Sequence, residues 1–278
     1  MLSSPQLDDF LEQGYVRVRS AFPPSLAERC RRLAAEQLGI DLDDPATWKA
    51  PVVRGLVEGE PLRQAANSDA LVEAIGQLLD PDPWQRRPNL GAFVVRFPAD
   101  ADPGDTGWHI DSSFQPEGDD RWFVNVRSRQ RGLLLLCLLS DVGPSDAPTR
   151  ILPGSHREMS RLLVPAGEEG LPGAYAGQRS EIPLPDTSGP VDLATGDAGD
   201  VFLCHPFLVH AAGWPHPQRS PRFIAQPPIS LPGSLELTGP EDRLSLVALA
   251  IRRGTGGQAS GRGRPGGEEM IRPMPSPR

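Results

Sequence analysis

Two short segments about a hundred residues apart carry the side chains of this sequence that could bind a metal. The first is Gly107-Trp108-His109-Ile110-Asp111, and the second runs from Gly199 to His210. Alternate side chains of an extended strand leave the same face, so His109 and Asp111 would converge on one point while Ile110 packs behind them. Two histidines and one carboxylate on one face of a metal leave its opposite face open, as in non-haem Fe(II) oxygenases. The pattern therefore predicts a redox metalloenzyme.

The second segment contains two histidines, His205 and His210, and only one is needed. Pro206 directly follows His205 and cannot donate to a strand ladder, so the strand from Val201 is expected to end there. The chain would then turn and re-enter at His210. We predict that His109, Asp111 and His210 are the catalytic and metal-binding residues, and that His205 packs nearby without binding the metal.

The sequence resembles a known family over roughly residues 5–253, the phytanoyl-CoA dioxygenase-like branch of the Fe(II)/2-oxoglutarate-dependent oxygenases. Four segments carry the resemblance, at residues 8–18, 108–111, 147–157 and 199–210. It implies a mostly β protein with flanking helices around a double-stranded β-helix core, of the jelly-roll or cupin-like kind. It also implies Fe(II), 2-oxoglutarate and O2 as cofactor and co-substrates, with release of succinate and CO2.

Arg222 is the best candidate for the far carboxylate of 2-oxoglutarate, because a guanidinium matches a carboxylate with two parallel hydrogen bonds. It lies twelve residues after His210, one more than is usual in this superfamily, and Arg219 is the second candidate. Relatives often carry a hydroxyl residue two places after the distal histidine, where this chain has Ala212. Halogenating relatives lack the carboxylate ligand, so Asp111 favours hydroxylation or another oxidation.

Other polar residues near the two segments have less certain roles, and alternatives stay open for each. Arg96 lies where relatives carry a polar co-substrate contact, but a structural ion pair explains it equally well. Thr149 or Arg150 could project into the core. The positive stretch at residues 125–131 could recognise an anionic substrate or form a solvated strand edge. Trp108 is expected to pack beside the metal, His156 to lie in a turn and His216 on the surface.

Composition bounds the class of protein. Glycine and proline together make up 61 of 278 residues, which is typical of a turn-rich β fold. The net charge of −8 argues against a nucleic-acid or anionic-membrane partner. Three scattered cysteines predict no disulfide framework, and no signal or membrane-spanning segment is found, so we expect a cytoplasmic protein. Residues 1–253 are expected to form one domain and residues 254–278 a disordered tail.

Apolar periodicity predicts helical flanks and a strand-rich centre. Helices are expected from Ser4 to Gly14, from Ser25, where Ser25 and Glu28 form a possible capping box, to Gly39, from Ser68 to Asp80, and over 243–253. Strands are expected at 15–18, 90–97, 133–140, 149–152, 191–193, 201–204 and 222–229. A long loop, 164–190, is either a lid that contacts substrate or simply mobile.

The leading function is a dioxygenase that hydroxylates a small molecule, such as a lipid-derived acid or a secondary metabolite. A redox-neutral hydrolase or isomerase using Zn or Mn is the alternative, but such an enzyme has no use for Arg222. A non-catalytic binding protein of the same fold would have no reason to keep all four of His109, Asp111, His210 and Arg222. The sequence predicts neither the substrate nor the oligomeric state.

Overall fold

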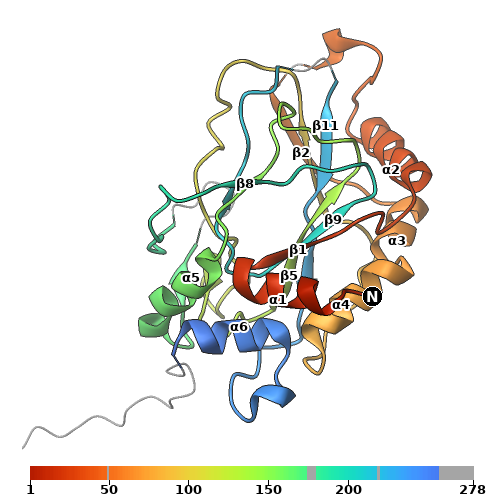
Figure 1. Cartoon of the computed structure of the whole chain (residues 1–278). Coiled ribbons are helices and arrows are strands. Elements are labelled where there is room, and N and C mark those ends of the chain that lie inside the picture. Colours follow the sequence, from red (N-terminus) through yellow and green to blue (C-terminus); the bar gives the residue numbers. More distant parts are fainter. Residues whose placement is uncertain (49, 174–179, 218–219, 257–278) are drawn as a thin grey trace, which may run out of the picture.

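The computed structural model describes residues 1–48, 50–173, 180–217 and 220–256 (Figure 1). Its helices are α1 (Ser4–Gln13), α2 (Pro24–Gln37), α3 (Glu60–Ala66), α4 (Asp69–Leu79), α5 (Ser155–Leu163) and α6 (Leu246–Gly254). Its strands are β1 (Tyr15–Val18), β2 (Val52–Leu56), β3 (Ala92–Arg96), β4 (Phe123–Val124), β5 (Arg131–Leu138), β6 (Arg150–Ile151), β7 (Leu171–Pro172), β8 (Asp192–Leu193), β9 (Val201–Cys204), β10 (His210–Ala211), β11 (Arg222–Ala225) and β12 (Pro228–Ser230).

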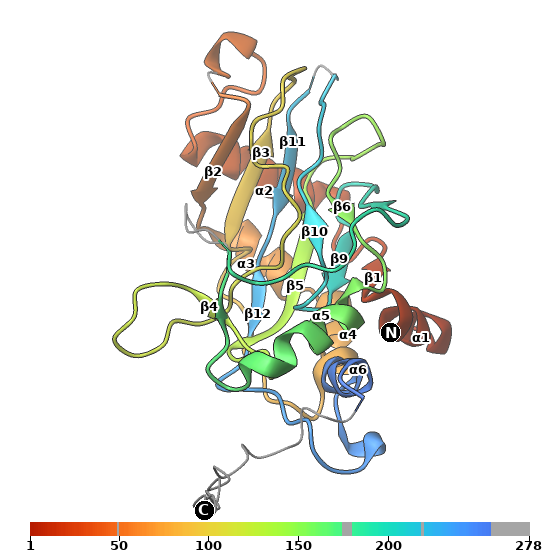
Figure 2. The ribbon, with the colours of Figure 1, turned by 90° about the vertical axis from the view of Figure 1, so that its left-hand side faces the viewer.

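Two antiparallel sheets face each other across an apolar interior. The main sheet has the strand order β1-β9-β5-β11-β3-β2, with β12 also paired to β5, and the smaller sheet has the order β10-β6-β8. Leu134, Phe202 and Ile224 from the main sheet and Ile151 from the smaller one belong to one buried cluster between them. Figure 2 shows β10 and β6 in front of the main sheet, with the helices α2 and α4 behind it. The predicted jelly-roll fold class is confirmed.

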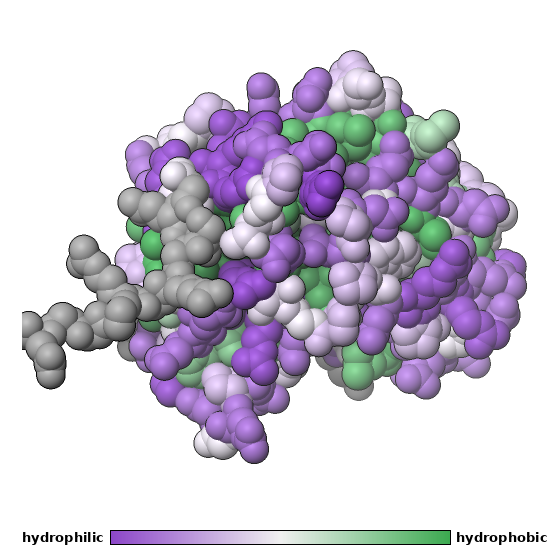
Figure 3. All heavy atoms as spheres, turned by 90° about the horizontal axis from the view of Figure 1, so that it is seen from below, coloured by the Kyte–Doolittle hydropathy of each residue, from purple (hydrophilic) through white to green (hydrophobic). Residues whose placement is uncertain are grey.

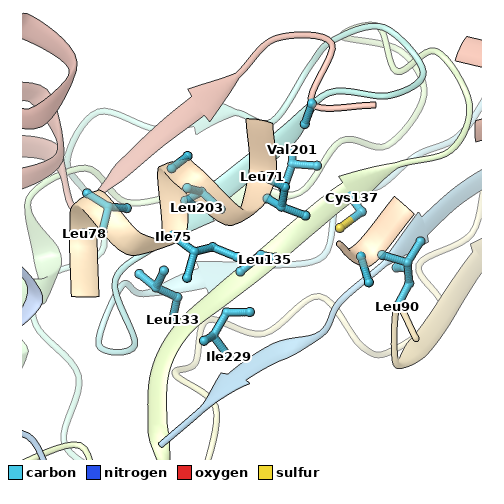
Figure 4. Packing of buried hydrophobic residues seen from close by; sticks show 14 of the residues in the cluster. Leu71, Ile75, Leu78, Leu90, Leu133, Leu135, Cys137, Val201, Leu203 and Ile229 are labelled. Carbon is cyan, nitrogen blue, oxygen red and sulfur yellow. The ribbon is translucent and has the colours of Figure 1, made fainter. Parts of the chain in front are cut away.

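Strand β5 is apolar along nearly its whole length because it is covered on both faces. Its even-numbered leucines, among them Leu134, lie in the interior cluster. Leu133, Leu135 and Cys137 of the same strand face the helices, and Leu71 and Ile75 of α4 pack on this side (Figure 4). The helices therefore seal the outer face of the main sheet and leave the interior for the site.

Most predicted elements are present, with shifts at their ends. The strand predicted over 222–229 is two strands, since Pro227 lies between β11 and β12 and has no N–H to donate. The predicted capping box at Ser25 is wrong, because α2 begins at Pro24 and the Glu28 side chain binds Arg31 and Arg32 instead. Strand β2 and helix α3, which lie between the second and third predicted helices, were not predicted. Of the predicted loop 164–190, residues 171–172 form β7, while 174–179 lie outside the described residues.

At its carboxyl end, the described chain closes with α6, which includes Gly254, and residues 257–278 of the predicted tail lie outside the described residues. On the face seen in Figure 3, hydrophilic residues predominate and apolar areas are scattered between them. No helix in the described part of the chain is long and apolar enough to cross a membrane. Cys30, Cys137 and Cys204 are all buried free thiols, as expected for a chain without a disulfide framework.

The prediction that His156 lies in a turn is wrong. Gly154 adopts a left-handed conformation, with φ of 75°, and α5 begins directly after it, so His156 lies in the first turn of a helix and is fully buried. Its ring lies 4.9 Å from that of His205, which is also buried. His156, Met159, Ser160 and Leu163 follow helical spacing, but the polar members conceal the pattern in the sequence.

We expect this histidine pair to make the protein sensitive to acid. Burial, with Arg157 nearby, lowers the pKa of His156 to about 4, and burial and His156 lower the pKa of His205. The unfolded chain therefore binds these protons more readily, and stability is lost as the pH falls from about 6.5 towards 4. His156 alone should account for about 3 kcal/mol over that range. Urea unfolding at pH 7.5 and 5.0 should show a smaller difference for His156→Leu than for the unchanged protein. An equal difference in both would contradict this assignment.

Candidate metal centre

The structure brings His109, Asp111 and His210 together. One ligand atom from each lies within 4.8 Å of the other two, and these are the residues that the sequence predicted. His109 Nε2 is 3.8 Å from Asp111 Oδ1, and the two imidazole rings are 4.5 Å apart between their centroids. Separations of this size fit three donors around one metal ion, because metal–nitrogen and metal–oxygen bonds are each about 2 Å long.

Backbone pairing fixes this arrangement. His109 and His210 exchange two hydrogen bonds of 3.0 Å, N–H to carbonyl in both directions. His210 pairs in turn with Ile151 of β6, whose side chain lies in the interior cluster. Directly paired residues project to the same face, so both histidines point into the space between the sheets. Ile110 lies in the other core cluster, away from the space between the sheets, as expected for the residue between two ligands.

Each histidine is also oriented by its own backbone. His109 Nδ1 is 2.9 Å from the carbonyl oxygen of Gly107, and His210 Nδ1 is 3.0 Å from that of Leu208. In this geometry Nδ1–H donates to the carbonyl, which leaves the lone pair on Nε2 free to bind a metal. Burial, and next to it the charge of His109, lowers the pKa of His210 to about 4. A neutral His210 near pH 7 is the form that binds metals.

Asp111 is held by a cation that the sequence analysis did not assign to this site. Arg131 Nη1 donates to Asp111 Oδ2 over 2.9 Å, and Arg131 Nη2 donates to the carbonyl oxygen of Ser112. Burial alone would raise the pKa of Asp111, but Arg131, His210 and His109 together lower it to about 2. The carboxylate is therefore ionised, with Oδ1 directed toward His109 and Oδ2 fixed by Arg131.

This position corrects the interpretation of the 125–131 stretch as a solvated strand edge. Asn125 is fully buried, and Arg131 begins the central strand β5 with only 12% of its side chain exposed. Arg129, by contrast, is exposed and lies over the ring of Phe114. The signal in the sequence was that Arg131 lies two residues before the longest apolar run, Leu133 to Leu139, where a charged residue needs a buried partner.

Arg131→Gln should weaken metal binding because Asp111 loses its orienting partner. Losing such a contact behind a ligand typically reduces affinity by about 10- to 100-fold. Arg129→Gln makes the same change of charge two residues away and should leave the affinity unchanged. Titration of the metal-free variants with Fe(II) under anaerobic conditions, or with Ni(II), would measure this difference, and equal affinities in the two variants would argue against the positioning role.

Arg222 lies on the inner face of β11. Ile224, two residues on, belongs to the interior cluster, whereas Phe223 between them packs on the helix side. Arg222 is 2% exposed and donates from Nη1 to the carbonyl oxygen of Ala147, while its Nε is buried with no hydrogen-bond partner among the described residues. Burial, with the charge of Arg96 next to it, lowers its pKa to about 9. In the described part of the chain no carboxylate forms an ion pair with this guanidinium.

Arg222 is also near the strand that carries His210. A Cβ built on Gly213, three residues after His210, would lie 2.6 Å from the Ala147 oxygen that Arg222 binds. The same Cβ would lie 2.1 Å from the oxygen of Pro148, so glycine is required there. Arg222 is therefore a buried cation with unused donors, close to the loop that follows the distal histidine. Arg219, the second candidate, lies outside the described residues.

Arg96 pairs with Arg222 across β3 and β11, and its Nη2 donates to both carboxylate oxygens of Asp105, over 2.8 and 2.9 Å. Its Nε and Nη1 are nevertheless buried without a described partner. The structural ion pair is therefore present, and donors remain for a further contact. Arg54 of β2 binds the same Asp105.

Thr149 is 3% exposed and lies two residues before Ile151, so alternation places it toward the interior. Arg150 lies on the other face, 4.8 Å from the ring centre of Trp108, and donates to the carbonyl oxygens of Thr106 and Ala212. It thus ties the segment before His109 to the segment after His210. The prediction that His216 lies on the surface is wrong, because it is 2% exposed and bridges to Ala99.

An antiparallel jelly-roll with two histidines and one carboxylate on two neighbouring, hydrogen-bonded segments defines a class of metal-dependent proteins. The sequence matches the phytanoyl-CoA dioxygenase (PhyH) family over residues 10–222, and the chain belongs to this family of Fe(II)/2-oxoglutarate-dependent oxygenases. No curated protein matches the sequence.

Solved structures show the same fold at low identity. HygX from Streptomyces hygroscopicus, with nickel and 2-oxoglutarate bound, is 16% identical with a TM-score of 0.56, over 84% of this chain and 88% of that chain. HygX with hygromycin B also bound has 18% identity and a TM-score of 0.52, over 83% and 88%. EvdO2 from Micromonospora carbonacea var. aurantiaca, complexed with 2-oxoglutarate, has 14% identity and a TM-score of 0.56, over 88% and 97%.

Proposed function

We propose that this protein is an Fe(II)- and 2-oxoglutarate-dependent dioxygenase that hydroxylates a small organic molecule and releases succinate and CO2. The observation that carries the proposal is the convergence of His109, Asp111 and His210 at a place where both imidazoles have Nε2 free and the carboxylate is ionised. Family membership and the structures of HygX and EvdO2, which bind 2-oxoglutarate, support it.

The residues fit the proposed groups. His109, Asp111 and His210 offer two nitrogens and one oxygen to Fe(II), and they leave the opposite face of the ion for 2-oxoglutarate and O2. Arg222 offers a buried cation with an unused Nε donor to the far carboxylate of 2-oxoglutarate. Arg96 and Thr149 are the further candidates for that carboxylate, since both lie on inward faces. Bound Fe(II) would supply the chemistry that couples oxidation of 2-oxoglutarate to oxidation of the substrate.

The protein's own contribution is position and the exclusion of water. The backbone bridge between His109 and His210 holds two ligands at a fixed separation, and Arg131 holds the third. The apolar cluster between the sheets, which includes Leu136 and Ile224, keeps bulk water away from the inner side of the site. A redox-neutral hydrolase could use the same three ligands, but it would leave the buried charge of Arg222 without a function.

Anaerobic addition of Fe(II) and 2-oxoglutarate tests the proposal without a known substrate. We expect a weak visible charge-transfer band that requires both additions, and slow formation of succinate once O2 is admitted. Iron bound at one per chain with neither the band nor succinate would exclude the oxygenase and favour the redox-neutral alternative.

A further inference from the structure

A cavity of about 540 Å³ opens beside Asp111 at one end of the main sheet. Its wall comes from the end of β2, the start of β3, the start of β5, the first and last residues of β12 and the segment after His109. Leu56 pairs with Ala92, and Ser230 with Arg131, so four of these strands meet at this edge. The side chains of Asp111 and His109 are 33% and 31% exposed, whereas His210 is only 5% exposed, so the metal centre is open on the side of Asp111 and His109.

The charges in the wall of this cavity do not balance. The lining contains two arginines, Arg87 and Arg131, and one carboxylate, Asp111. Arg131 is already paired with Asp111 over 2.9 Å. Arg87 forms no ion pair with any carboxylate in the described ranges of the chain. When Asp111 binds a metal ion, the ion also shares the negative charge of its carboxylate. Arg87 therefore remains a cation without a compensating charge in the wall of the cavity.

Arg87 is fixed in place by its neighbours. Its Nε donates to the carbonyl oxygen of Asn89 over 3.2 Å, and its Nη1 donates to that of Pro228 over 2.7 Å. Gly91 has a φ of +71°, and a Cβ there would lie 3.2 Å from Arg87 Nη2. The guanidinium therefore rests against bare backbone, with other donors still available. A preorganised fork of this kind suits a carboxylate or phosphate group.

The rest of the lining is mixed. Gln130, Gln226, Ser113 and Ser230 offer hydrogen-bonding groups, whereas Leu56, Trp122 and Leu231 are apolar. Leu56 is 77% exposed although it is a large apolar residue. Cavities that bind small molecules commonly combine a largely apolar wall with a few fixed polar groups, and this volume lies within their usual range.

We propose that this cavity binds the organic substrate and that Arg87 binds an anionic group of it, a carboxylate or a phosphate. The substrate class is then a small anionic molecule, anchored at Arg87 so that its other end lies beside Asp111. This inference rests on the proposed function, because the bound molecule is a substrate only if the protein is that enzyme. The binding of an anionic molecule at Arg87 does not depend on it.

Matched pairs of small probes test the proposal: phenyl phosphate against phenol, and benzoate against benzamide. NMR titrations of the full chain, without metal and again with Ni(II) and 2-oxoglutarate, would measure their affinities. We expect at least one anion to bind at least tenfold more tightly than its neutral partner, and Arg87→Gln to lose at least tenfold of that affinity. Arg86→Gln is the matched control, because Arg86 is exposed and outside the cavity lining, and it should bind as the unchanged protein does.

A second measurement does not depend on how well Arg87→Gln folds. The Arg87 Nε–H resonance of the unchanged protein, identified by its absence in Arg87→Lys, should shift when the anion is added. Anionic and neutral probes of equal affinity, anion binding that survives Arg87→Gln, or an Arg87 resonance that does not move would overturn the proposal. These experiments measure binding and not turnover. A failure to form succinate would therefore refute the proposed oxygenase activity without affecting the test of anion binding at Arg87.

Discussion

His210→Ala should remove stoichiometric iron binding and all turnover of 2-oxoglutarate. His210 is 5% exposed, and its Nε2 is the free nitrogen of a ring fixed by Leu208. Alanine at this position leaves only His109 and Asp111, and two protein ligands hold a divalent ion weakly. Iron content per folded chain, measured after anaerobic loading and desalting, gives the result directly.

His205→Ala is the matched control, because it removes the other histidine of the same segment. The His205 ring packs against Phe10, His156 and Phe207, and its Nδ1 accepts a hydrogen bond from the backbone N–H of Phe207. Its loss should cost about 2 to 3 kcal/mol of stability through the cavity and the unpaired donor, while iron stays at one per chain. Iron retained in His210→Ala and lost in His205→Ala would show that the ligand assignment is wrong.

The second large effect is expected at Arg222. Arg222→Ala should raise the concentration of 2-oxoglutarate needed for half-saturation by about 30- to 1,000-fold, since a charge-assisted, two-pronged contact is worth roughly 2 to 4 kcal/mol. Iron content should stay near normal because Arg222 contacts none of the three ligands; its bond is to Ala147. The charge-transfer band, titrated with 2-oxoglutarate under anaerobic conditions, measures the change without turnover.

Two comparisons make the Arg222 result specific. Arg219→Ala should leave the 2-oxoglutarate requirement unchanged, and a large effect there with none in Arg222→Ala would transfer the role to Arg219. Added methylguanidinium should partly restore 2-oxoglutarate binding in Arg222→Ala, because the small cation can enter the space left by the side chain and donate hydrogen bonds to the far carboxylate. A variant that only lost stability would show a changed unfolding transition, but its folded molecules would need the same concentration of 2-oxoglutarate.

The metal ligands could be predicted because their pattern is local. His109 and Asp111 lie two residues apart on an extended segment. Pro206, directly after His205, marks the end of one strand, and the chain turns before it reaches His210. The contact between Arg131 and Asp111 could not be predicted, because it joins β5 to the segment after His109, and these come together only in the folded protein. The same is true of Arg87, whose surroundings come from separate parts of the chain.

Most helices and strands of the fold could also be predicted from the sequence. Short β-rich runs separated by turn residues indicated most strands of the two sheets, and apolar stripes indicated α1, α2 and α4. Helix α5 was missed because two of its four regularly spaced buried side chains, His156 and Ser160, are polar. Strand β2 has partly exposed side chains and contains Gly55 next to its last residue, so its composition resembles a loop. It is a strand because β3 offers it a full register of partners.

The pairing of β1 with β9 has a consequence for synthesis of the chain on the ribosome. Tyr15 to Val18 lie opposite Cys204 to Val201, and β9 is the only strand that β1 pairs with in the described structure. The first strand therefore emerges long before its partner is translated. Until then Phe10 and Val16, which are buried in the finished protein, have no sheet to pack on. Contacts between residues so far apart in the chain slow folding, and unpaired strand edges favour aggregation. A nascent chain that stops before residue 201 should thus need a chaperone to hold its amino-terminal segment.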